Sequence, residues 1–535
     1  MSKGYLSLIL HAHLPFVRHP EYLFSLEEKW YFEALTECYL PLLEVLHRLE
    51  RDNIDYRLTI SISPTLAAMW QDSYLKEKYR SYLLKLLDLA DKEIKRTAGD
   101  PHFFPLAQHY RQRFQSAYRD YFEHYQGDLV GAFRRLAQGG KIELITCAAT
   151  HGYLPLLLNR PEAVYAQLYT AIDQHTRLFG RAPKGIWLPE CAYESGLEEF
   201  LAELGINYFF LETHGILYAK PRPAYGTYSP LLTPSGVAAF GRDEESSKQV
   251  WSKTEGYPGD YYYRDFYRDI GYDLPMEYIA PYIHPDGIRI HTGFKYYRIT
   301  GKTNHKEPYN PVEAQKKAAE HAGNFMFNRE RQIEYLADVM NRPPIIVAPY
   351  DAELFGHWWY EGPAWLEFLF RKIHYDQNIF TPITPSEYLN LGLPLQEAEP
   401  SPSSWGHEGY HGVWLNQENE WIYPHLHMAA EKMVQAVRDF PQATGIEKEA
   451  LTQLGRELLL AQASDWPFIM STGTMVRYAK ERVHDHLVRF NRLLTQLYRR
   501  QIDEEWLRKL QTHDNIFPHL DYKIYAPLTE KTAVH

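Results

Sequence analysis

Short apolar segments alternate with longer helical segments over about the first 390 residues of the chain. Apolar runs of strand length occur at residues 5–10, 56–62, 141–146, 185–188, 208–211 and 345–348. Helical periodicity between them is clearest at residues 26–51, 161–179 and 311–340. Strand-then-helix repetition predicts an α/β fold with parallel strands, in an open sheet or a closed barrel. In both arrangements the chemistry gathers beyond the carboxyl ends of the strands.

The expected domain organisation follows from where this alternation stops. Residues 76–140 are largely helical with no strand signal, so we expect a helical insertion. Residues 393–404 are rich in Pro, Ser and Glu and resemble a linker, beyond which the pattern is almost wholly helical. The expected units are a catalytic unit at 1–95 and 141–395, a helical insertion at 96–140 and a helical C-terminal domain at 405–525.

A second interruption, at residues 221–260, has a different composition. It is rich in Gly, Pro, Ser and Tyr and shows no sustained period. A loop of this length inside a compact domain is usually disordered or functional, and active-site lids are the common functional case. The rings of Tyr225, Tyr228 and Trp251 favour a lid over the active site.

The charge and aromatic content indicate the kind of partner. The net charge of −11 opposes a polyanion such as nucleic acid. The chain contains 42 Tyr, 25 Phe and 12 Trp, more than packing alone requires of Tyr and Trp. These two side chains can stack on an apolar face and also donate hydrogen bonds. We therefore expect an uncharged, ring-shaped substrate such as a sugar.

The cysteines and the apolar segments indicate the cellular compartment in which the protein is expected. Cys38, Cys147 and Cys191 are odd in number and far apart, which predicts no disulfide framework and favours a reducing compartment. The apolar run at 5–10 is too short for a signal peptide and fits a first strand. No apolar stretch approaches the roughly 20 residues of a membrane span. We expect a cytoplasmic protein without a membrane partner.

Two stretches place carboxylates directly after apolar runs and beside tryptophan and tyrosine. In the first, Glu190 follows Pro189, so its backbone freedom is low and its side chain has a fixed direction. A helix N-terminal carboxylate is the alternative role, and Glu194 fits that role better. In the second, Asp351 and Glu353 share a strand face, so spacing alone does not choose between them. Such carboxylates suit a site that ionises one acid and keeps the other protonated.

Histidines also follow the expected strands. His11 and His13 lie on one face if the first strand continues, and His151 follows a later strand. Together with Asp351, the first two could bind zinc. They could instead donate hydrogen bonds to sugar hydroxyls or cap helices. No clear third and fourth ligand lies at close spacing, so we expect substrate-binding histidines and no metal.

Tryptophans recur beyond the linker. Trp405, Trp414 and Trp421 stand among glycines, and Asp465 and Trp466 interrupt a helical region. Tryptophans in such a setting commonly form stacking platforms, and domain-interface packing is the alternative.

These motifs resemble those of family-57 glycoside hydrolases over nearly the whole chain. The segments that match the five conserved regions of that family in order are His11–Pro15, His151–Pro155, Trp187–Tyr193, Tyr350–His357 and the helix around Asp465. The resemblance implies an incomplete (β/α)7 barrel with a helical insertion and an all-helical C-terminal domain. It implies Glu190 as the nucleophile and Asp351 as the acid/base.

Within the family, the chain is most similar to the 1,4-α-glucan branching enzymes. The similarity rests on the form of residues 187–193, on the helical tail and on a long loop expected over the cleft. It implies substrate contacts by Arg264, Trp405, Trp414 and Asp465, and gives Tyr225 or Tyr228 as the lid tyrosine.

The resemblance therefore implies a retaining transferase that cleaves α-1,4 links and forms α-1,6 branches in a glycogen-like glucan, with no cofactor. An α-amylase or 4-α-glucanotransferase of the same family is the nearest alternative. A metal-dependent carbohydrate deacetylase or mannosidase using His11, His13 and Asp351 is a different class. A non-catalytic glycan-binding protein is a third alternative, which the intact pair of carboxylates disfavours.

Overall fold

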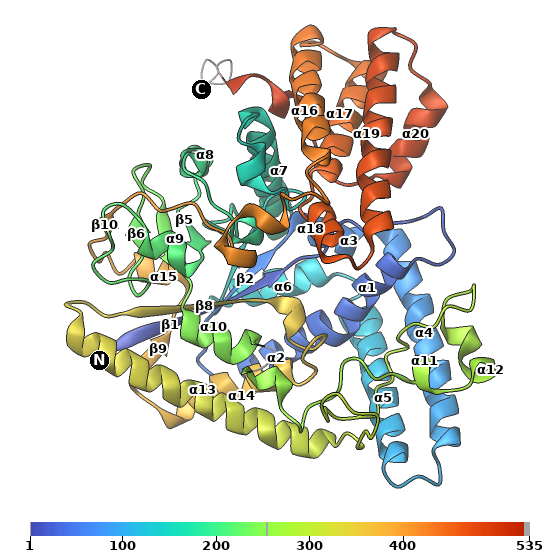
Figure 1. Cartoon of the computed structure of the whole chain (residues 1–535), viewed down its shortest axis with the longest axis vertical. Coiled ribbons are helices and arrows are strands. Elements are labelled where there is room, and N and C mark those ends of the chain that lie inside the picture. The colour runs from blue at the N-terminus through green and yellow to red at the C-terminus, as the bar shows by residue number, and fades with distance from the viewer. Residues whose placement is uncertain (1, 253–254, 529–535) are drawn as a thin grey trace.

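The apolar runs form the parallel strands of a barrel in the computed structural model, which describes residues 2–252 and 255–528 (Figure 1). Within this part of the chain the parallel barrel strands are β1 (Gly4–Ala12), β2 (Leu58–Ile62), β3 (Ile142–Ile145), β4 (Gly185–Ile186), β5 (Tyr208–Leu211), β7 (Ala238–Gly241) and β8 (Ile345–Asp351). Shorter strands are β6 (Leu231–Leu232), β9 (Phe380–Pro382) and β10 (Gln396–Glu397).

Two sheets curl toward each other to make the barrel. One contains β3, β2, β1 and β8 in that order, and the other contains β7, β5 and β4. A parallel bridge between Thr146 and Ile186 joins β3 to β4. The amide of Asp243, just after β7, donates to the carbonyl of Val347 in β8 (2.9 Å). The two sheets are therefore joined by isolated contacts at β3–β4 and β7–β8, and not by continuous strand pairing. The expected incomplete (β/α)7 barrel is confirmed.

Helices cover the outside of the barrel, and side chains fill its interior, so the strands are buried on both faces. Every residue of β2 and β5 is buried, which explains why these strands appear as continuous apolar runs rather than alternating ones. The helices between the strands are α1 (Leu26–Ala34), α2 (Leu40–Arg51), α3 (Pro64–Gln71), α6 (Leu129–Gln138), α7 (Pro161–Phe179), α8 (Leu197–Glu203), α9 (Thr213–Leu217), α10 (Glu244–Trp251), α13 (Pro311–Val339), α14 (Gly362–Asp376) and α15 (Pro385–Leu389).

A helical hairpin stands away from the barrel at the lower right of Figure 1. It consists of α4 (Ser73–Arg96) and α5 (Phe103–Tyr118), against which the short helices α11 (Ile270–Asp273) and α12 (Met276–Ile279) lie. The boundary expected at residue 96 falls at the end of α4, inside the hairpin. The domain limits remain predictions.

The segment 221–260 is not one long loop, so the lid prediction is wrong in that respect. It contains β6, β7 and α10, and its residues 253–254 lie outside the described part of the chain. The carbonyl of Tyr228 accepts from the amide of Ile345 (3.0 Å), where β8 begins. The Tyr225 hydroxyl donates to Asn341 (2.5 Å). Both candidate lid tyrosines therefore lie toward the end of the barrel opposite Asp351.

The C-terminal helices stack against α7 at one end of the molecule, at the top of Figure 1. They are α16 (Ile422–Asp439), α17 (Gly445–Ala461), α18 (Asp465–Thr472), α19 (Val476–Tyr498) and α20 (Glu504–His513). The turn between α17 and α18 reaches the barrel. There Ala463 pairs with Gly152, and the amide of Ser464 donates to the carbonyl of His151 (3.0 Å).

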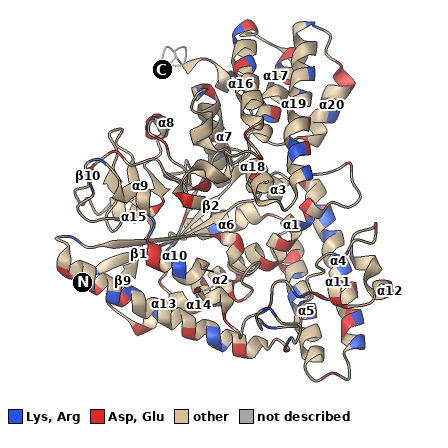
Figure 2. Ribbon diagram, viewed as in Figure 1, with Lys and Arg blue, Asp and Glu red and all other residues tan. Residues whose placement is uncertain are grey.

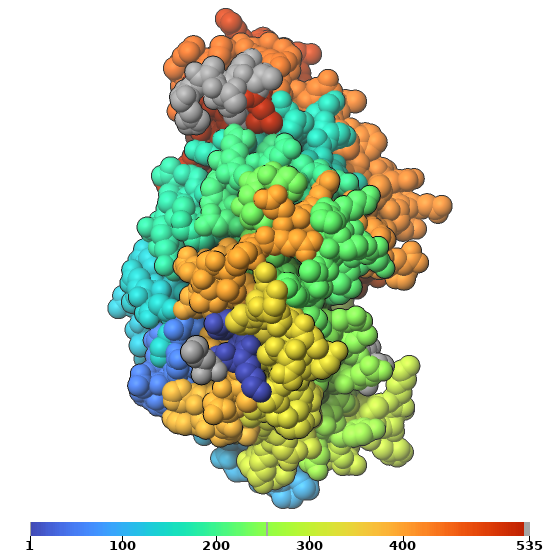
Figure 3. Space-filling view, turned by 90° about the vertical axis from the view of Figure 1, so that its left-hand side faces the viewer, coloured from blue at the N-terminus to red at the C-terminus, as the bar shows by residue number. Residues whose placement is uncertain are grey.

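Acidic and basic residues are interspersed over the helices (Figure 2). The beginning of β1 lies beside α13 and the α14–β9 segment (Figure 3), where the amide of Lys3 donates to the carbonyl of Ile379 (2.7 Å). None of the described helices is both long enough and apolar enough to span a bilayer.

Candidate active site

Polar side chains gather where the barrel strands end. In the sheet register, His11 of β1 lies opposite Ser61 of β2 on one side and Asp351 of β8 on the other. His151 follows β3 and Glu190 follows β4. Parallel strands bring their carboxyl ends to the same rim, so residues far apart in the sequence meet here.

Glu190 is held in a turn with an unusual backbone conformation. Its φ is 60° and that of Cys191 is 52°, both in the left-handed region that few non-glycine residues adopt. Trp405 Nε1 donates to Glu190 Oε2 (2.8 Å), and Ser464 Oγ donates to Glu190 Oε1 (2.9 Å). Each carboxylate oxygen thus accepts a hydrogen bond from a residue beyond the linker, and these two bonds hold the carboxylate in one orientation.

The electrostatic environment of Glu190 opposes its ionisation. Burial raises its pKa to about 7, and the nearby Asp465 charge acts in the same direction. The hydrogen bonds from Trp405 and Ser464 act in the opposite direction, because they stabilise the carboxylate. The group therefore changes charge near neutral pH.

Asp351 is the carboxyl group with the stronger tendency to stay protonated. Burial raises its pKa well above the usual range, and the charges of Glu353 and Glu190 raise it further. Glu353 accepts from the backbone amide of His13 (3.1 Å) and from the Tyr39 hydroxyl (2.5 Å). Glu353 is thus held at the rim by hydrogen bonds, whereas Asp351 interacts electrostatically with Glu190.

Three histidines stack on one another in the site. The rings of His13 and His151 are 3.8 Å apart and nearly parallel, and His11 stacks on Trp187 at 5.1 Å. His11 Nε2 and His151 Nε2 lie 3.1 Å apart, while their Nδ1 atoms bond to Ser61 and Ser464 respectively. Burial lowers the pKa of both His11 and His151, so both imidazoles are neutral.

His13 differs from its two neighbours. Burial alone would lower its pKa, but the charge and hydrogen bonds of Asp465 outweigh that effect and raise it. His13 Nε2 lies 3.2 Å from both Asp465 oxygens. Asp465 therefore lies at the rim, in the first turn of α18, as expected of a site residue. It contacts His13, which is also an expected site residue.

Trp414 and Arg264 are expected substrate contacts, but the structure buries both side chains. Trp414 is 1% exposed and stacks on Tyr153 at 4.6 Å, so it has no open face for a sugar ring and packs as a core residue. Arg264 is buried, with its guanidinium 3.9 Å from the ring centre of Tyr360 and 3.4 Å from Glu37. Arg264 is thus paired with Glu37, which also bonds His357 at the end of the fourth conserved segment, Tyr350–His357.

The sequence did not single out Ser464 or Glu37. Ser464 bonds both Glu190 and His151, and its only signal was its place directly before Asp465. Glu37 lies in a wide π-helical turn, Leu35–Tyr39, and bonds His357 Nδ1 (2.7 Å). Such turns occur often at functional sites, yet they leave no periodic signal in the sequence.

Some side chains at this rim lie close enough together to hold a metal ion, which the zinc alternative requires. Among the described residues at this rim, such groups are His13 with His151 and Asp465, and His11 with Cys147 and His151. Asp351 belongs to neither, so the ligand set expected for zinc is not brought together. Burial also raises the pKa of the Cys147 thiol, which disfavours the thiolate that a metal needs.

The site combines a barrel rim, two buried carboxyl groups and a lining of imidazole and indole groups. This combination suits acid and nucleophilic catalysis on an uncharged substrate. The profile of glycosyl hydrolase family 57 matches residues 7–400, and that of the C-terminal part of 1,4-alpha-glucan branching enzymes matches residues 425–525. The chain belongs to glycosyl hydrolase family 57.

Individual relatives cover nearly the whole chain. A 1,4-alpha-glucan branching enzyme of Thermococcus kodakarensis is 37% identical over 96% of this chain and 77% of its own length. The crystal structure of an alpha-amylase from Thermotoga maritima is 43% identical, with a TM-score of 0.92 over 98% of this chain and 99% of that one. A branching enzyme structure from Pyrococcus horikoshii is 35% identical, with a TM-score of 0.88 over 98% and 97%.

Proposed function

We propose that the protein is a retaining 1,4-α-glucan branching enzyme that acts on amylose- and glycogen-type glucans. The observation that carries the proposal is the coupling of Glu190 and Asp351 at one rim, with one carboxyl titrating near neutrality and the other held protonated. The match of residues 425–525 to the branching-enzyme profile supports the same activity.

The first chemical step uses both groups. Protonated Asp351 donates its proton to the glycosidic oxygen as the C–O bond breaks, and ionised Glu190 attacks the anomeric carbon. A covalent glycosyl–Glu190 ester and a shortened glucan result. Trp405 and Ser464 hold the Glu190 carboxylate in place for this attack.

The second step sets the type of bond that forms. Asp351, now ionised, removes the proton from the 6-hydroxyl of an acceptor glucan, whose oxygen attacks the anomeric carbon and releases Glu190. Attack by a 4-hydroxyl would give 4-α-glucan transfer, and attack by water would give hydrolysis. The name of the Thermotoga maritima relative makes hydrolysis the alternative to measure.

The test is incubation with amylose, followed by debranching and sizing of the released chains. Branching gives new short chains with few new reducing ends, whereas an α-amylase gives one reducing end for each cleavage. Glu190→Gln and Asp351→Asn should both lose at least about 1,000-fold in turnover. Glu194→Gln, a nearby and more exposed acid, is the matched control and should keep activity.

We also propose the domain limits given above and a reducing, cytoplasmic location. The three cysteines are buried and unpaired, which fits a reducing compartment.

A further inference from the structure

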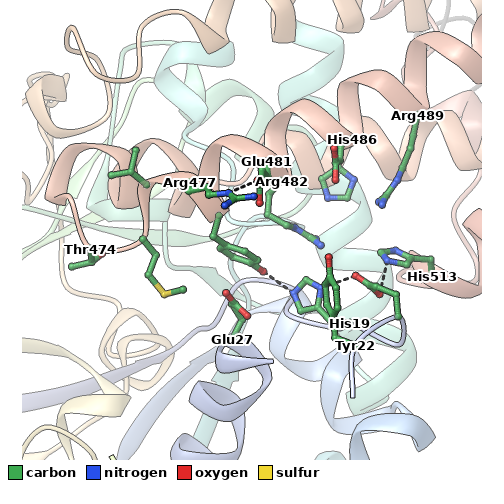
Figure 4. Close-up of a pocket in the computed structure, with 15 residues that line it drawn as sticks. His19, Tyr22, Glu27, Thr474, Arg477, Glu481, Arg482, His486, Arg489 and His513 are labelled. Atoms are coloured by element: carbon green, nitrogen blue, oxygen red, sulfur yellow. Dashed lines mark hydrogen bonds and ion pairs between the residues drawn. The ribbon is translucent and has the colours of Figure 1, made fainter. Parts of the chain in front are cut away.

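A cavity of about 560 Å³ lies outside the catalytic rim, between the N-terminal loop and α19 (Figure 4). Its volume falls within the roughly 300–1,000 Å³ range of small-molecule sites. One wall is the loop at residues 19–27, and the opposite wall is the first half of α19 with His513 behind it. Figure 4 shows Arg482, His486, Arg489 and His513 directed toward one space above His19 and Tyr22.

Two buried side chains on this wall have nitrogen atoms without a protein partner. Arg482 is 6% exposed and His486 is fully buried. Arg482 Nε and His486 Nε2 have no hydrogen-bond partner, although Arg482 Nη2 donates to the carbonyl of Phe16 (3.3 Å) and His486 Nδ1 lies 2.7 Å from Glu457. Buried polar groups are normally satisfied, so these two suit a ligand that brings hydrogen-bonding oxygens.

The charges around the cavity are nearly balanced. The lining includes three arginines, Arg477, Arg482 and Arg489, and four acids, Glu21, Glu27, Glu481 and Asp485. Most of the arginine and histidine groups already have an acidic partner. Arg477 pairs with Glu481 (2.7 Å), Arg489 with Asp514 (2.8 Å) and His513 with Glu21 (2.8 Å). This balance favours a neutral ligand rich in hydroxyl groups over an anion.

Aromatic rings border the cavity and connect it to the active site. Tyr22 is 59% exposed at the mouth. The Tyr478 hydroxyl bonds His19 Nε2 (2.9 Å), and its ring meets Trp466 at 5.9 Å. Trp466 follows Asp465, which binds His13 at the catalytic rim. Tyr478 and Trp466 thus link the wall of the cavity to the His13–Asp465 contact at the catalytic rim.

We propose that this cavity is a secondary binding site for an α-1,4-glucan chain, with Tyr22 as the ring that stacks on a sugar and Arg482 and His486 as hydrogen-bonding groups at its base. The inference rests on the proposed function for the substrate class. A long glucan chain that spans both sites would gain affinity from the cavity, whereas a short glucan such as maltoheptaose would occupy the cavity and the catalytic rim independently.

The test compares Tyr22→Ala and Thr474→Trp with Leu23→Ala. Thr474 lines the cavity and is exposed, so tryptophan there would fill the space without entering the core. Leu23 is 99% exposed on the same loop, but its side chain does not line the cavity, which makes it the matched control. We expect KM for amylose to rise about fivefold to tenfold in the two cavity variants, with kcat and KM for maltoheptaose unchanged.

Binding is measured separately in the full-length Asp351→Asn protein, which cannot consume the ligand. Calorimetry with maltoheptaose should detect two sites, and Thr474→Trp should remove one of them. An unchanged KM for amylose, or a single site before and after substitution, overturns the proposal. Stabilisation by inorganic phosphate that Thr474→Trp abolishes also overturns it, in favour of an anion site. Wild-type protein that binds at the cavity but forms no branches refutes the proposed function alone.

Discussion

Glu190 receives one hydrogen bond on each carboxylate oxygen, from Trp405 and from Ser464. Burial favours the neutral acid, whereas these donors favour the carboxylate, and the balance places its pKa at about 7. A nucleophile must be ionised, so activity should fall as the pH drops through this value. The hydrogen bond from Trp405 is therefore predicted to act on reactivity as well as on position.

Trp405→Phe keeps an aromatic ring, although a smaller one, and removes the N–H donor. Without this donor the carboxylate is less stable, so the pKa of Glu190 should rise and the acidic limb of kcat/KM should move to higher pH. The shift should be roughly one pH unit, because a hydrogen bond to a charged group contributes about 1.5 kcal/mol and one pKa unit corresponds to about 1.4 kcal/mol. The measurement is a pH profile of initial rates on amylose.

Trp414→Phe is the control for this prediction. Its buried Nε1 has no hydrogen-bond partner, so the same chemical change there should leave the acidic limb in place. An unmoved limb in Trp405→Phe, or equal shifts in both variants, would contradict the role given to Trp405.

At the scale of elements, the turn between α17 and α18 delivers C-terminal residues to the barrel. Ser464 and Asp465 meet His151 and His13 there, and the Thr150 hydroxyl donates to the carbonyl of Leu459 nearby. The tail is thus part of the site and not only a cover for the barrel.

Ser464→Ala should lower kcat about 10- to 100-fold with little change in KM, since a hydrogen bond to a charged group contributes about 1.5–3 kcal/mol. Ser471→Ala lies on the same helix but faces Asn416, so it should keep wild-type rates. Steady-state kinetics with melting curves of both proteins separate the catalytic effect from a loss of folding. Equal losses of rate in the two variants would show that α18 acts only as a support.

The sequence predicted elements best where one periodic signal was long. The helix expected at 161–179 is α7 with the same limits, and the apolar runs became β1, β2, β3, β4, β5 and β8. It missed β7 because Val237, Ala238, Ala239 and Phe240 form a short run between glycines, with only one β-branched residue. The predicted lid arose from that error.

At the scale of the whole molecule, the barrel brings strand ends together and the tail completes the rim. The sequence could predict the first part, because polar residues directly after buried strands must share one edge. It could not predict that Trp405 would bond Glu190 or that Trp414 would be buried against Tyr153. Those outcomes depend on how a separate helical region packs, and no local pattern records such packing.

We infer that Glu190 forms a covalent bond to the glucan while Asp351 transfers protons. Trapping that ester tests the claim most directly. The protein is incubated with a fluorinated glucosyl fluoride, which slows breakdown of the intermediate, and peptides are analysed by mass spectrometry. We predict one added glycosyl unit on the peptide containing Glu190, and none in the Glu190→Gln variant. A label on Asp351 or Glu353, or full turnover of the reagent without any labelled peptide, would contradict the account.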